Sequence, residues 1–283
     1  MNEARGAASP VLVQTSGKAE PFRTSGGRAA RQNFANYTYI LPMNTTAKDK
    51  LIVALDVDTT ALALDLFVTL RDVVGMFKVG SQLFTAAGPE VVRQIVARGG
   101  RVFLDLKFHD IPNTVAAAGI EAARLGVSIF NVHASGGAEM MKRTAAAVAE
   151  VSDREGLSRP KVIAVTVLTS MDQKSLEQIG LTDDPRSLVV RLARSAAACG
   201  LDGVVASPQE TGSIRQAISS PDFLIVTPGI RSSSDPSNDQ KRTLTAAAAI
   251  GAGADYLVVG RPILAAADPV AAARTLVAEI ENG

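Results

Sequence analysis

The sequence has one cysteine and two histidines, and this scarcity excludes several kinds of protein. Cys199 cannot form a disulfide within the chain, and a lone thiol suits a reducing compartment, so we expect a cytoplasmic protein. His109 and His133 add only two more soft ligands, which is too few for the usual four-ligand zinc site. We therefore expect neither a disulfide scaffold nor a bound metal.

Long apolar runs and an excess of either charge are also missing. Asp, Lys, Gly or Pro interrupts every apolar run before it reaches the roughly 18 residues of a membrane span. Lys and Arg total 29 against 28 Asp and Glu, for a formal charge of +1. Such a balance argues against a nucleic acid or a membrane surface as the partner. The totals indicate a soluble protein that acts on a small molecule.

Residues 1–42 differ in composition from the rest of the chain. They are rich in Ser, Gly and Ala, and their basic residues outnumber Glu3 and Glu20; these basic residues are Arg5, Lys18, Arg23, Arg28 and Arg31. The basic segment leads into no long apolar stretch, so it is not a secretory signal. Its composition fits a transit peptide, but we favour a disordered extension or an upstream start codon, with one folded domain over 43–283 that opens at Met43.

From residue 51 onward, short apolar runs alternate with Ala- and Leu-rich segments whose apolar residues recur at three and four positions. Glycines stand where four of these helical segments should end, at Gly99, Gly126, Gly200 and Gly253. Runs without an alternating polar face, each followed by a helix, predict a parallel sheet that helices cover. The eight expected strands are 51–57, 76–80, 101–108, 128–133, 161–169, 203–207, 223–229 and 255–260. Eight such units in one chain favour an α/β fold of the (β/α)8 TIM-barrel type.

Charged and polar residues interrupt these runs at their carboxyl ends, where a (β/α)8 barrel builds its active site. They are Asp56, Lys78, Asp105, Lys107, His133 and Thr169. Asp105 and Lys107 are two positions apart on one strand, so simple alternation points them the same way. The alternative is an ion-pair network that only closes the barrel mouth, but several unlike charges in one buried ring stabilise a fold poorly. We therefore expect a charged catalytic site.

A second group of residues follows the seventh and eighth runs, where barrels often bind phosphate. Glycine lets backbone N–H groups approach an anion, and arginine binds phosphate oxygens with two parallel hydrogen bonds. The segment from 231 to 240 between the two loops is polar and long enough to act as a lid. The candidate phosphate ligands are Gly229, Arg231, Gln240, Gly260 and Arg261.

Seven motifs in order along the chain make residues 49–281 resemble the orotidine 5'-phosphate decarboxylase family, in its bacterial form. They are "ALDVD" (54–58), "FKVG" (77–80), "DLKFHDIPNT" (105–114), "VTVLTS" (165–170), "TPGIR" (227–231), "DQKR" (239–242) and "VVGRPI" (258–263). The resemblance implies decarboxylation of orotidine 5'-phosphate to UMP and CO2, the last step of de novo pyrimidine biosynthesis. It also implies that the reaction needs no metal and no organic cofactor.

The family's charged array falls on Lys78, Asp105, Lys107 and Asp110. By resemblance, Lys107 donates a proton to C6 of the pyrimidine, and Asp105 faces the carboxylate that leaves. Lys78 and Asp110 keep the array in its charged state.

The resemblance assigns the remaining contacts to other loops and to a second subunit. Asp56 and Lys78 would contact the ribose hydroxyls. Asp110 and Thr114 would enter the site of the neighbouring subunit, which implies a homodimer with two shared active sites. Thr169 and Ser170 match the pyrimidine-binding segment, and the phosphate ligands would be Gln240, Gly260 and Arg261, with Arg231 beside them.

Two other functions stay open at this point. One is a Mg2+-dependent sugar-phosphate decarboxylase or aldolase of the same superfamily, but those enzymes carry a metal-binding glutamate where this chain has Lys78, and a lysine repels a divalent cation. The other is a barrel that binds a nucleotide phosphate without catalysis. We expect His109 and His133 to be structural hydrogen-bonding residues.

Overall fold

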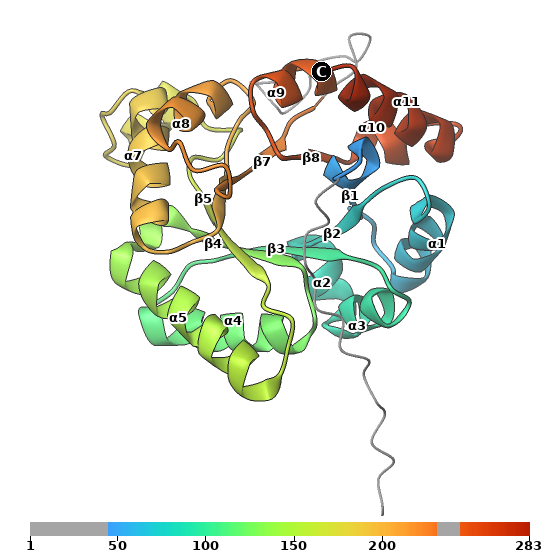
Figure 1. Cartoon of the computed structure of the whole chain (residues 1–283), viewed down its shortest axis with the longest axis horizontal. Helices are drawn as coiled ribbons and strands as arrows, with labels where there is room; N and C mark the ends of the chain where they lie inside the picture. The colour runs from blue at the N-terminus through green and yellow to red at the C-terminus, as the bar shows by residue number, and fades with distance from the viewer. Residues whose placement is uncertain (1–44, 231–243) are drawn as a thin grey trace, which may run out of the picture. The chain divides into compact units, whose positions relative to one another are not determined.

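The described part of the chain is a closed barrel of eight parallel strands (Figure 1). The structure is a computed structural model, and it describes residues 45–230 and 244–283. Each strand pairs with the next along the chain, and β8 pairs with β1 to close the ring. The predicted (β/α)8 fold is therefore confirmed. The expected extension over 1–42 and the expected lid over 231–240 lie outside the described residues, as do Arg231 and Gln240.

All eight strands lie within the predicted apolar runs. They are β1 (Leu51–Ala54), β2 (Met76–Gly80), β3 (Val102–Phe108), β4 (Ile129–His133), β5 (Lys161–Val165), β6 (Gly203–Val205), β7 (Leu224–Pro228) and β8 (Tyr256–Val259). The expectation that Thr169 ends the fifth strand is wrong. β6 ends at Val205, so the chain beyond β5 has no neighbouring strand with which to pair. It makes a turn instead, in which Met171 N donates to Leu168 O at 2.9 Å.

The helices surround the barrel, as Figure 1 shows. Short polar residues begin several of them: the side chains of Asp184 and Asp268 accept hydrogen bonds from the third residue beyond, and a proline follows each at the first helical position. The four glycines predicted to end helices all have positive φ, between 76° and 101°. The α-helices are α1 (Thr60–Leu70), α2 (Ser81–Ala87), α3 (Glu90–Ala97), α4 (Pro112–Arg124), α5 (Ala138–Glu155), α6 (Gln173–Gln178), α7 (Pro185–Ala198), α8 (Thr211–Ala217), α9 (Ala246–Gly251), α10 (Arg261–Leu264) and α11 (Pro269–Glu281), and η1 (Ala47–Lys50) and η2 (Ala134–Gly136) are 3-10 helices.

The apolar core has two layers, because successive side chains of a strand point to opposite faces. One layer fills the barrel and includes Ile52, Met76, Phe103 and Ile129. The other, larger layer lies between the strands and the helices. Lys78 lies two positions beyond Met76 on β2. The interior therefore changes from apolar to charged toward the carboxyl ends of the strands.

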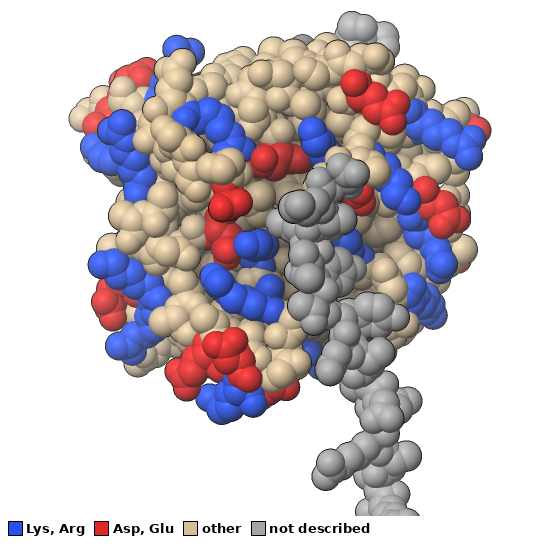
Figure 2. Space-filling model, in the orientation of Figure 1, with Lys and Arg blue, Asp and Glu red and all other residues tan. Residues whose placement is uncertain are grey.

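The surface carries both signs of charge. Lys and Arg side chains are interspersed with Asp and Glu on the face shown in Figure 2. Within 45–230 and 244–283, none of the helices has the length and apolar character needed to cross a membrane.

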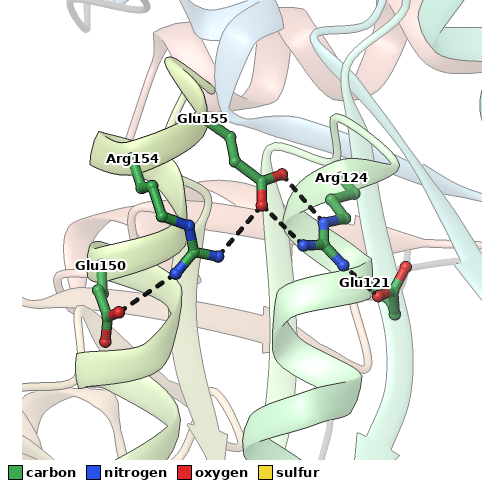
Figure 3. Close-up of polar contacts among 5 residues, drawn as sticks. All are labelled: Glu121, Arg124, Glu150, Arg154 and Glu155. Carbon is green, nitrogen blue, oxygen red and sulfur yellow. Dashed lines mark hydrogen bonds and ion pairs between the residues drawn. The ribbon is translucent and has the colours of Figure 1, made fainter.

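An ion-pair network joins the carboxyl ends of α4 and α5 (Figure 3). Arg124 on α4 holds Glu155 on α5 through two hydrogen bonds, Nη2 to Oε1 at 2.7 Å and Nε to Oε2 at 3.0 Å. Glu121 accepts a third bond from Arg124 at 2.7 Å, and Arg154 links Glu155 to Glu150 at 3.2 Å each. Hydrogen bonds from Arg124 and then Arg154 lower the pKa of Glu155 to about 2.

We predict that Glu155→Gln lowers the melting temperature by a small amount that shrinks at high salt, because the network is solvent-exposed. Because the pKa of Glu155 is lowered, the stabilisation that the network gives depends on pH. It is fully present above the usual glutamate pKa near 4.5 and is lost as the pH falls toward about 2. Thermal unfolding at several pH values measures it. Glu281→Gln, at the exposed end of α11, is the control; equal effects of both variants would contradict the prediction.

Candidate active site

Four of the predicted charged residues meet at the carboxyl ends of β1, β2 and β3. Lys78 Nζ lies 3.0 Å from Asp56 Oδ1 and 3.5 Å from Asp105 Oδ2. Lys107 Nζ lies 2.7 Å from Asp105 Oδ1. Acidic and basic groups thus alternate along the chain of contacts from Asp56 to Lys107, with Lys78 only 9% exposed. This is the arrangement in which each charge stabilises its neighbours in ionised form.

The strand register places these side chains side by side. Lys78 on β2 pairs with Ala54 on β1, and Gly80 pairs with Asp105 on β3. Asp56 comes just after the last ladder bond of β1, in which Leu55 N donates to Lys78 O at 2.9 Å. A Cβ atom at Gly80 would lie 2.9 Å from Lys78 Nζ, so glycine leaves the space that the ammonium occupies. Gly80 was not among the predicted site residues.

The end of β3 is irregular, although Lys107 and Asp105 lie side by side as simple alternation predicts. Leu104 pairs with Phe130, but the next pair is Phe108 with Val132. Between these two pairs β3 advances by four residues while β4 advances by two. Within this irregularity Lys107 has φ 53°, and it is the one non-glycine described residue with positive φ. Such a backbone costs about 1–3 kcal/mol and is typical of functional sites. The two side chains therefore meet at a bulged end of the strand.

Asn131 on β4 is a fifth polar member of this cluster, and it was not among the predicted site residues. Its side chain is fully buried. Its amide oxygen accepts a hydrogen bond from Lys107 N at 2.8 Å, and its amide nitrogen donates to Asp105 Oδ1 at 2.7 Å. The signal in the sequence was one polar residue inside the apolar run "SIFNVH".

The Asp105 carboxyl has a lowered pKa although it is largely buried. Burial alone would raise this pKa, but the charges of Lys78 and Lys107, together with hydrogen bonds from Lys107 and Asn131, outweigh burial and lower it. Asp105 is therefore a buried carboxylate that stays ionised between two ammonium groups. A negative charge of this kind can act on the charge of a bound ligand.

Asp110 does not join the array within this chain. Its Oδ1 accepts from Ile111 N at 2.6 Å, and among the described residues no ion pair links Asp110 to Lys78 or Lys107. Asp110 and Thr114 are exposed on the loop and first turn that lead into α4, and the Ile111 side chain between them is 66% exposed. The predicted fourth member of the array thus points to solvent in the single chain.

The two histidines lie beside the array. The rings of His109 and His133 have centroids 5.3 Å apart. Burial, then His109 and Lys107, lower the pKa of His133, while Asp105 acts in the opposite direction. The structural hydrogen-bonding role expected of the two histidines stays a prediction.

The described part of the predicted phosphate site lies on the adjoining rim. Gly229 follows β7 with φ 84°, and Gly260 follows β8. Since β8 pairs with β1, a Cβ atom at Gly260 would lie 3.4 Å from Asp56 Oδ2. Arg261 is exposed at the first position of α10. These residues therefore border the charged array.

Thr169 and Ser170 lie in the loop between β5 and α6, half-buried and exposed respectively. Among the described residues, no three His, Cys, Asp or Glu side chains form a group that could hold a metal ion.

Comparisons with known proteins agree on one family. Residues 49–276 match the model of the "Orotidine 5'-phosphate decarboxylase / HUMPS family". The chain is 56% identical over 239 residues to orotidine 5'-phosphate decarboxylase of Geobacter sulfurreducens, covering 84% of this chain and 98% of the relative. It is 54% identical over 236 residues to the Moorella thermoacetica enzyme of the same name, covering 83% and 93%.

A solved structure of orotidine 5'-phosphate decarboxylase from Lactobacillus acidophilus superposes with a TM-score of 0.72 at 37% identity, covering 81% of this chain and 98% of that one. The Pyrococcus horikoshii OT3 structure of the same name gives 0.64 at 26% identity, covering 82% and 99%.

We predict that removing the Lys78 charge raises the pKa of Asp105, because its ammonium is the first of the groups that lower it. Carboxyl carbon NMR of Lys78→Met should show Asp105 titrating at higher pH than in the unsubstituted protein. Lys161→Met removes another lysine from an ion pair, with Asp202 Oδ1 at 3.0 Å and at the start of β5, and serves as the control. An unchanged Asp105 titration in Lys78→Met would contradict the assignment.

Proposed function

The chain belongs to the orotidine 5'-phosphate decarboxylase / HUMPS family, and we propose that it converts orotidine 5'-phosphate to UMP and CO2, with Lys107 as proton donor to C6. This reaction is the last step of de novo pyrimidine biosynthesis. The observation that carries the proposal is the buried Asp105 carboxylate held between the ammonium groups of Lys78 and Lys107. In this proposal the protein's own side chains supply the chemistry, and no cofactor takes part.

Lys107 acts on the charge that the reaction creates. When the bond between C6 and the carboxylate breaks, CO2 leaves and the electron pair stays on C6. A fixed ammonium beside C6 stabilises this charge and then neutralises it by transferring a proton from Nζ to C6. The Lys107 ammonium is oriented for this role before the substrate arrives, because Asp105 holds it at 2.7 Å.

Asp105 acts on the charge that the reaction removes. Its lowered pKa keeps it ionised, so it repels the substrate carboxylate that lies against it, and this repulsion disappears as CO2 departs. In this proposal Lys78 and Asp56, which are paired at 3.0 Å, contact the ribose hydroxyls. Lys78 and Asp110 keep the array in its charged form.

The phosphate and the base bind away from the bond that breaks. Gly260 and Arg261 after β8 grip the phosphate, with Arg231 and Gln240, which lie outside the described residues. Thr169 and Ser170 contact the pyrimidine from the loop after β5. Binding energy from such remote groups can serve the transition state by fixing the ring against Lys107.

The active unit in this proposal is a homodimer with two shared sites. Its support is the exposure of Asp110 and Thr114 and the missing ion pair between Asp110 and the array in the single chain. The exposed Ile111 side chain beside them provides apolar area for a subunit contact. Asp110 of one subunit would then complete the array of the other.

The residue at position 78 argues against the Mg2+-dependent alternative within the family. The position that would help to hold the metal is Lys78, whose ammonium lies 3.5 Å from Asp105 Oδ2. A cation there would meet a like charge.

We predict that the protein consumes orotidine 5'-phosphate in the presence of EDTA, with loss of the orotate absorbance. Lys107→Ala should lower kcat by at least about 10²–10⁴-fold, because it removes the proton donor. UMP binding, measured by calorimetry, should change far less, since UMP lacks the carboxylate and needs no proton.

Two outcomes would contradict this assignment. Failure of the unsubstituted protein to turn over in EDTA would overturn the proposed reaction. Near-normal turnover of Lys107→Ala would overturn the role of Lys107 alone. Lys161→Met, in the ion pair with Asp202, is the matched lysine control and should retain activity.

We also predict that Asp110→Ala and Lys107→Ala, each inactive alone, recover activity when mixed and allowed to exchange subunits. Each hybrid dimer would contain one intact site, made of Lys107 from one subunit and Asp110 from the other. Random exchange should restore about one quarter of the unsubstituted activity, since half the dimers are hybrids with one working site. Absence of recovery after proven exchange, or full activity of Asp110→Ala alone, would contradict the shared site.

A further inference from the structure

Asn131 is a buried amide to which the proposed chemistry gives no role. It lies in the middle of β4 and is 0% exposed. On its face of β4, Asn131 lies between Ile129, which is apolar, and His133. It pairs with Ile163 of β5. A polar side chain in such surroundings is costly unless its hydrogen bonds are made.

Both ends of the Asn131 amide are used, and the partners fix which end points where. The backbone N–H of Lys107 can only donate, so the atom 2.8 Å from it is the amide oxygen. The carboxylate of Asp105 can only accept, so the atom 2.7 Å from its Oδ1 is the amide nitrogen. A group with one acceptor and one donor, at the length of asparagine, is needed to serve both.

The bond to Lys107 replaces one that the strand pairing cannot make. Between Leu104 and Phe108 the ladder from β3 to β4 is interrupted, and Lys107 adopts its positive φ inside that gap. A backbone N–H in such a gap needs another acceptor. The Asn131 oxygen is that acceptor, so the side chain holds the bulge in the shape that turns Lys107 toward Asp105.

We propose that Asn131 is a positioning residue for the decarboxylation: it holds the strained backbone of Lys107 and orients the Asp105 carboxylate. Asp105 Oδ1 then accepts from both Asn131 and Lys107, while Oδ2 faces Lys78. This inference rests on the proposed function and adds a residue that does not itself contact the substrate.

An isosteric substitution separates this role from simple filling of the core. Asn131→Asp keeps the acceptor for Lys107 N but places a carboxylate against Asp105. Lys78 and Lys107 favour an ionised Asp105, so the introduced carboxyl takes the first proton and, once protonated, donates to Asp105 again. The other titratable groups on this side are His133 and His109, and β5 presents apolar Ile163 and Val165.

The test is the pH dependence of kcat/KM for orotidine 5'-phosphate. We expect Asn131→Asp to lose about 10²-fold near pH 8 and to regain part of this loss toward about pH 5, relative to the unsubstituted enzyme. Asn131→Leu removes both hydrogen bonds without adding a charge, so it should lose kcat at every pH while UMP still binds. Asn131→Leu also tests the proposal if Asn131→Asp does not fold.

Thr144→Val is the control, since Thr144 is equally buried but its Oγ1 bonds Met140 O within α5, at 2.8 Å. It should leave the pH profile unchanged. The proposal is overturned if Asn131→Asp loses activity by the same factor at every pH, or if Asn131→Leu keeps normal kcat.

A second readout does not depend on the reaction. In Asn131→Leu the Asp105 carboxyl should titrate at higher pH, because one of the hydrogen bonds that lower its pKa is gone. If the unsubstituted protein fails to turn over, the proposed function falls while this titration still decides the role of Asn131. An unchanged titration would overturn that role.

Discussion

The charge on the buried Asp105 carboxylate is the constraint on which the site depends. Burial disfavours the ionised form of Asp105, but the ammonium groups of Lys78 and Lys107 and the amide of Asn131 outweigh this effect. Lys78 in turn is held by Asp56, and Lys107 is held through its backbone by Asn131. Each charged group in the array therefore stabilises the charge of its neighbour.

The closed barrel brings this array and the described part of the predicted phosphate site, Gly229, Gly260 and Arg261, to one rim. Asp56 follows the first strand and Gly260 follows the last, yet β1 and β8 are neighbours in the ring. The reacting group and the phosphate-binding residues can then contact the same small ligand. The helices and the apolar interior keep the strands in register. The fold thus supplies the fixed distances on which preorganised electrostatic catalysis depends.

The charged members of the site were predictable because a charge is conspicuous in an apolar strand. Asp56, Lys78, Asp105 and Lys107 stood at the ends of strands whose ends had to meet. Gly80 and Asn131 were missed for a physical reason: their roles depend on neighbouring strands. The need for glycine at Gly80 comes from the position of Lys78 Nζ, and the need for an amide at Asn131 comes from the gap in the pairing of β3.

The sequence by itself determined the eight strand and helix units, their parallel closure and the chemical character of the site, because these follow from local apolar periodicity and from the cost of placing charge in a core. Only the tertiary structure decided the backbone shape at Lys107, since alternation along a strand assumes an unbroken ladder and the pairing of β3 with β4 shifts there. The resemblance had already implied that Asp110 stands apart from the array of its own chain, where its Oδ1 accepts from Ile111 N. The backbone shape at Lys107, in contrast, depends on contacts between segments that sequence spacing does not encode.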